Sequence, residues 1–163
     1  MMPDPLHPAL VHFPIVLALL SPVIAGTLLW AIHAKKLPAT AWLGVVLLQL
    51  CVAGSGWLSA EAGEEEEERV ERFVLEAPLE EHEEAAERFV WIAGLLIPLA
   101  AAGLLPGVLG GGARAALTIA SLGAAVAVGQ VGHTGGELVY RHGAASARLE
   151  RGVEAIGERA EGR

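Results

Sequence analysis

The chain has 163 residues, 53% of them hydrophobic, and a mean hydropathy of +0.50, which is too apolar for an ordinary soluble domain. Its formal net charge is −8, but 13 of its 19 acidic residues lie between Glu61 and Glu87. The apolar segments are therefore almost free of charge, and no basic patch indicates nucleic-acid binding. Cys51 is the only cysteine, which excludes an internal disulfide and cysteine-based metal sites.

The first apolar segment predicts a membrane-spanning helix over 9–32, retained as a signal anchor because no basic n-region or cleavage site precedes it. Pro22 lies inside it and predicts a kink. A short polar loop with Lys35 and Lys36 leads to a second span over 41–60, and such a short loop makes the two helices antiparallel neighbours.

The acidic segment 61–87 is expected to be a solvated loop with some helical content, because Pro78 interrupts any continuous helix. A third span is expected over 86–105, a glycine-rich turn over 106–112, and a fourth span over 115–132.

These spans have almost no polar face, which excludes a soluble four-helix bundle. The predicted fold is all-α, a membrane four-helix antiparallel bundle over 1–143 with an acidic loop between the second and third helices. The remaining segment, 144–163, is expected to be a short amphipathic surface helix or a loose tail, since Leu149, Val153 and Ile156 recur at helical spacing.

Antiparallel spans bring five of the six histidines to one end of the bundle, and His33 to the other. The five are His7, His12, His82, His133 and His142.

Orientation is predicted from the positive-inside rule. Lys35, Lys36 and Arg114 favour a cytoplasmic location for the His33 end, because the arginines near the other end lie among acids. The histidine cluster and the acidic loop are then expected on the periplasmic face of a bacterial inner membrane, in a multi-pass protein.

Histidines at membrane depth indicate function, although any single one is more often an interfacial residue. His12 is the deepest of the five, and with His82 it forms the expected axial pair for a b-type haem, with His142 or His133 as alternates. Arg88 or Arg141 would then pair with the haem propionates.

The haem hypothesis depends on a slot between helices, which four small residues at the histidine level would leave open. They are Gly54, Gly56, Gly129 and Gly132.

If these glycines only let the helices pack closely, three or more of the five histidines are expected to bind a bare Zn, Cu or Fe ion instead. A structural membrane subunit is the third alternative. The stretch starting at His82 lacks the second histidine that a zinc protease needs one turn later, which argues against protease chemistry. An electron carrier or redox subunit is favoured over a stand-alone enzyme.

The segment from Gly132 to Gly143 is expected to act as a lid. In this interpretation Gly135 and Gly136 turn the chain back, so that Arg141 and His142 close over the site. Two intramembrane amides, Gln49 and Gln130, are expected to form interhelical hydrogen bonds, with an orienting contact to His133 as the alternative role for Gln130.

The chain resembles a bacterial family of small membrane proteins catalogued as domain of unknown function 2231. The resemblance rests on His7-Pro8-x-x-Val11-His12-Phe13-Pro14-Ile15, on His82, and on Gly135-Gly136-Glu137-Leu138-Val139-Tyr140-Arg141-His142-Gly143. It implies a four-helix membrane domain, adds weight to His7, His12, His82 and His142, and gives less support to His133. Members joined to c-type cytochrome segments favour electron transfer.

The leading functional prediction is an electron carrier or redox subunit that holds one haem b and exchanges electrons with a c-type cytochrome or a quinone. No nucleic-acid partner is expected, and the sequence leaves a homo-oligomer open.

Overall fold

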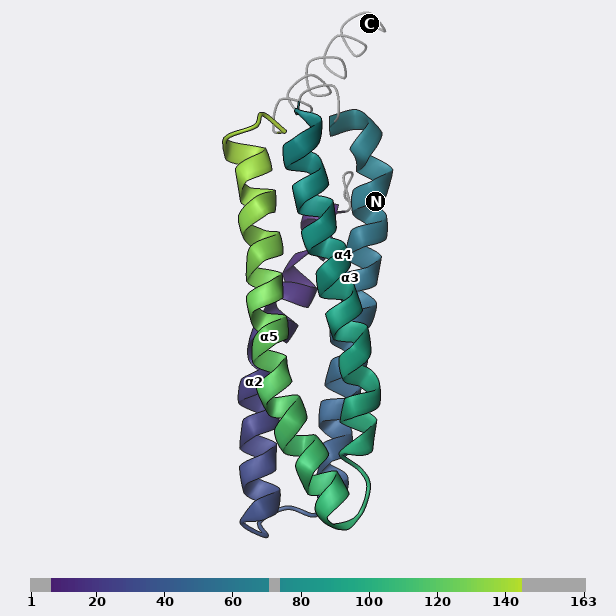
Figure 1. The fold of residues 1–163 in the computed structure, drawn as a ribbon, viewed down its shortest axis with the longest axis vertical. Coiled ribbons are helices and arrows are strands. Elements are labelled where there is room, and N and C mark those ends of the chain that lie inside the picture. The colour runs from purple at the N-terminus through teal and green to yellow at the C-terminus, as the bar shows by residue number, and fades with distance from the viewer. Residues whose placement is uncertain (1–6, 71–73, 145–163) are drawn as a thin grey trace, which may run out of the picture.

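The computed structural model describes residues 7–70 and 74–144, and within them it contains helices joined by short turns (Figure 1). The elements are α1 (His7–Leu10), α2 (His12–His33), the 3₁₀ turn η1 (Ala39–Trp42), α3 (Leu43–Val70), α4 (Glu76–Ala102) and α5 (Gly107–Tyr140). The all-α fold is as predicted.

The four long helices run antiparallel and form a ring in which α2, α3, α4 and α5 each pack against the next, and α5 packs back against α2. The α2–α3 and α4–α5 connections lie together at the lower end in Figure 1, which we name the loop end. The start of α4 and the end of α5 lie at the opposite end, which we name the histidine end. Each helix is long and apolar enough to cross a membrane. The chain is thus a multi-pass membrane four-helix bundle.

The interior of the bundle is built mainly from small residues, while large apolar side chains cover its outer surface. Ala18, Ala25, Ala93 and Ala100 are fully buried. Each long helix also carries large apolar side chains that are more than half exposed, for example Val23, Leu47, Leu95 and Ile119. An apolar outer surface of this kind fits a lipid environment, because lipid replaces water as the outer solvent and small residues let helices pack closely.

The acidic segment is helical over 61–70 and 76–87, which corrects the predicted loop. Helix α3 continues to Val70 and α4 already begins at Glu76. Glutamate is a good helix former, and Arg88 and Glu84 form an i,i+4 pair on α4. Pro78 falls in the first turn of α4, where its missing N–H has no intrahelical partner to lose.

The predicted turn at 106–112 is also corrected. The chain reverses over 103–106, and the three glycines at 110–112 belong to α5. A helix is favoured there because backbone N–H and C=O groups near a bilayer must find partners within the chain. Gly110 is required at this corner, because a Cβ there would overlap the carbonyl of Leu105.

The predicted lid is absent as well. Helix α5 passes through Gly135 and Gly136 and ends at Tyr140, so these glycines do not turn the chain back. The turn comes later, where the N–H of His142 bonds to the carbonyl of Glu137 and Gly143 adopts a φ of 84°. The predicted surface helix or tail lies outside the described residues, apart from Ala144.

Candidate functional site

The structure brings two histidines from distant parts of the chain together at the histidine end. His7, in α1, and His82, in the second turn of α4, have ring centroids 6.3 Å apart and ring planes 88° apart. Both residues are partly buried. We refer to them as the histidine pair.

His7 is held by the backbone of α3. Its Nδ1 lies 2.7 Å from the carbonyl oxygen of Ser59. A carbonyl only accepts hydrogen bonds, so Nδ1 carries the proton and donates. In the neutral imidazole, Nε2 then keeps its lone pair and remains able to bind a metal ion.

His82 is held by the side chain of Thr134 on α5, whose Oγ1 lies 2.9 Å from Nδ1. The same hydroxyl lies 3.2 Å from the carbonyl oxygens of Gln130 and Val131. A hydroxyl has one proton, and when it donates to either carbonyl it accepts from Nδ1 of His82. In the neutral imidazole, Nε2 of His82 then keeps its lone pair, as Nε2 of His7 does.

Two glycines give the imidazoles their space. A Cβ on Gly63 of α3 would lie 3.2 Å from the His7 ring, and one on Gly135 of α5 would lie 3.0 Å from Cε1 of His82. The helices on either side of the histidine pair therefore approach it at positions without a side chain. Gly135 therefore makes room for the imidazole of His82 and does not form the predicted turn.

His12 lies elsewhere, although it was predicted to pair with His82. It is the first residue of α2 and is exposed. His12 follows His7 by five positions, which is about 140° of rotation around a helix at 3.6 residues per turn. The two side chains therefore project from different faces, and α1 places His7 against α3.

The other candidate residues lie on or near the surface. His133 is exposed and lies 3.9 Å from Glu137, which also accepts a hydrogen bond from Arg141. Arg88 is exposed and pairs with Glu84, and His142 is partly buried in the final turn. Within the described residues, no group of three or more His, Cys, Asp or Glu side chains is close enough to hold a metal ion.

The four glycines predicted to leave a slot for a macrocycle lie in two different environments. Gly54, Gly129 and Gly132 are exposed, with nothing within 4 Å of a Cβ built on them. Gly56 is buried, but Phe89 fills the space beside it, 2.9 Å from such a Cβ. These glycines therefore open outward or receive an aromatic side chain.

Of the two intramembrane amides, one makes the predicted interhelical contact. Gln49 donates from Nε2 to Oγ of Ser21 at 2.5 Å, joining α3 to α2. The side chain of Gln130 is exposed, and Thr134, one turn further along, contacts His82. Sequence reasoning missed Thr134 and Ser59, and the one signal for Thr134 was its position beside Gly135.

The fold and this site define a helical multi-pass membrane protein with a histidine pair at one end of the bundle. No family model, curated protein or solved structure matches the chain in the comparisons made. The resemblance to domain of unknown function 2231 therefore remains a prediction.

Proposed function

We propose that the protein binds a non-haem transition-metal ion, of the Zn, Cu or Fe class, through His7 and His82. The observation that carries this proposal is the shared arrangement of the two imidazoles. Each has its Nδ1 bonded to an oxygen of a neighbouring helix, Ser59 O or Thr134 Oγ1. Metal-binding histidines are oriented in this way, with one ring nitrogen held by the protein and the other directed at the ion.

Imidazole is a suitable ligand for each of these metals. Two protein ligands leave coordination positions for water or for a substrate, as open metal sites do. Acidic residues on the adjoining turns of α4, such as Glu80, Glu81 and Glu84, are exposed at the same end. Their negative potential favours the approach of cations.

The contacts favour a bare ion over haem b. The haem hypothesis, with electron transfer to a c-type cytochrome or a quinone, depended on the glycine slot and on His12. The side chain of Phe89 fills the space beside Gly56, and His12 is exposed. Haem b is therefore the alternative to the bare ion, and the test described next distinguishes the two.

The test is the metal content and absorption spectrum of the protein purified in detergent from cells supplied with haem and trace metals. We expect about one ion per chain and no Soret band. His7→Ala and His82→Ala should each lose the ion. His12→Ala and His133→Ala are matched controls that should keep it, because both side chains are exposed.

The outcomes separate the three functions. A Soret band would show that the bound group is haem and not a bare ion. A wild-type protein without metal or haem, or equal metal content in all four variants, would leave only the structural role of the histidines.

We further propose that the histidine end faces the periplasm, in keeping with Lys35, Lys36 and Arg114 at the other end. In a Cys51→Ala background, a single cysteine from Glu80→Cys should react in intact cells with a membrane-impermeant maleimide, while one from Lys36→Cys should react only after lysis. The reverse pattern would invert the orientation.

A further inference from the structure

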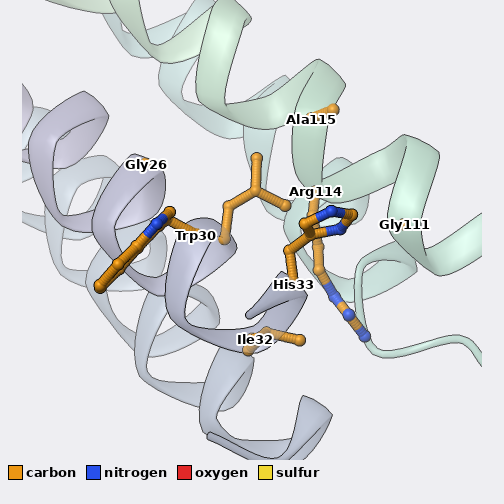
Figure 2. Close-up of a pocket in the computed structure, with 8 residues that line it drawn as sticks. Gly26, Trp30, Ile32, His33, Gly111, Arg114 and Ala115 are labelled. Atoms are coloured by element: carbon orange, nitrogen blue, oxygen red, sulfur yellow. The ribbon is translucent and has the colours of Figure 1, made fainter. Parts of the chain in front are cut away.

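A groove of about 520 Å³ lies near the loop end of the bundle, far from the histidine pair (Figure 2). Helices α2 and α5 form its two sides. Residues that line it include Gly26, Leu29, Trp30, His33, Arg114 and Ala115. Most of this surface is apolar, and the groups able to donate hydrogen bonds are Arg114, His33 and the indole N–H of Trp30.

Arg114 is a buried cation, only 8% exposed. Its Nε donates to the carbonyl of Gly103 at 2.7 Å, and its guanidinium carbon lies 6.0 Å from the centre of the Trp42 ring. The sequence contains no Asp or Glu between residues 5 and 60 or between 88 and 136, so the segments that build the loop end supply no carboxylate. Buried charges are normally paired, because desolvation is costly without a counter-charge.

The surroundings of the groove add to the positive potential. His33 lines the groove from the last turn of α2. Trp30 is one of the residues that line the groove, and Nζ of Lys36 lies 4.2 Å from the centre of its ring. Lys36 therefore places a second cation close to the groove. The groove thus combines an apolar wall at Gly26 and Leu29 with donors and cations at one end.

We infer that this groove binds an anionic phospholipid, with its phosphate at Arg114 and His33 and an acyl chain against Gly26 and Leu29. Charge complementarity supports this occupant, because a guanidinium binds phosphate oxygens through several N–H groups and Nε accounts for only one of them. Anionic lipids are also enriched in the cytoplasmic leaflet, which basic residues beside a span favour. This site is independent of the proposed metal binding.

Quenching of Trp30 by brominated lipid tests the inference. The full chain carrying Trp57→Phe and Trp91→Phe, two exposed positions on the outer surface, would be reconstituted in phosphatidylcholine vesicles containing brominated phosphatidylglycerol or brominated phosphatidylcholine. Two tryptophans remain, of which Trp30 is exposed to lipid and Trp42 is fully buried. We expect brominated phosphatidylglycerol to be preferred about fivefold, since one cation near the surface contributes about 1 kcal/mol. Arg114→Gln should abolish the preference.

Two further variants keep the test valid if Arg114→Gln fails to fold. His33→Ala and Lys36→Gln leave the bond from Arg114 to Gly103 in place, and each should reduce the preference while the helical circular dichroism stays unchanged. Arg88→Gln, at the other end of the bundle, is the matched control and should keep the full preference.

Equal quenching by the two brominated lipids, or an unchanged preference in folded Arg114→Gln, would overturn the inference. Loss of the preference in Arg88→Gln would attribute it to diffuse charge and would also overturn it. If excess inorganic phosphate removed the preference at constant ionic strength, the site would be one for free phosphate and not for a lipid.

Discussion

Gly135 of α5 lies directly against the imidazole of His82, so that a Cβ on this glycine would be 3.0 Å from Cε1 of the ring. The neighbouring Gly136 has nothing within 4 Å of its Cβ position. The two glycines are adjacent in one helix and differ in whether they contact the histidine pair. They therefore allow the site to be perturbed without removing a ligand.

Gly135→Ala is expected to weaken metal binding about tenfold, because the added methyl displaces an imidazole that Thr134 now orients. Gly136→Ala should leave the affinity unchanged. Gly136→Ala should also raise helix stability, by about 1 kcal/mol at most, since alanine is the better helix former, whereas at Gly135 the contact with the His82 ring opposes this gain. Isothermal titration with Zn²⁺ and thermal unfolding measure the two effects, and equal affinities for both variants would contradict the proposed site.

Metal binding is expected to weaken as the pH is lowered from 8 to 5, because protons and the metal ion compete for the imidazole nitrogens. Binding should therefore release protons, which titrations in buffers of different ionisation enthalpy would measure. His7→Ala should lose this dependence together with the ion. An affinity independent of pH would point to ligands other than imidazole.

Gly56→Ala is expected to destabilise the bundle by about 1–3 kcal/mol, because a methyl would lie 2.9 Å from the Phe89 ring in a packed interior. Gly54→Ala, two residues earlier on the exposed side of α3, has open space and should be neutral or slightly stabilising. Unfolding in a mild detergent titrated with sodium dodecyl sulfate compares them. A loss of the same size in both variants would show that the Phe89 contact is not the cause.

The buried pair Gln49 and Ser21 is expected to couple α3 and α2 by about 0.6 kcal/mol, and by no more than about 1.7 kcal/mol. A double-mutant cycle with Gln49→Leu and Ser21→Ala isolates this term. The cost of Gln49→Leu should be small, because Oε1 of Gln49 is buried without a hydrogen-bond partner and its removal relieves that penalty. A coupling energy near zero would leave the amide with a packing role alone.

Much of the fold follows from the sequence, but the ends of its helices do not. Long charge-free apolar stretches allow few arrangements other than spanning helices, and short connections make neighbours antiparallel. The acidic segment was predicted as a loop because five consecutive glutamates and Pro78 dominate its composition, yet α3 and α4 extend into it. Helix boundaries depend on backbone hydrogen bonds and on contacts with neighbouring helices, which composition does not specify.

By itself, the sequence determined that the protein is an apolar four-helix bundle and that His7 and His82 belong to the same end of it. Only the tertiary structure decided that His7, rather than His12, is the partner of His82, because the rotation of each helix about its axis sets which side chain faces inward. The same holds for Arg114, whose burial beside His33 depends on how α5 packs against α2. The position of a residue in the sequence of its helix sets how far along the bundle axis it lies. The packing of the helices against one another sets whether its side chain points inward or outward.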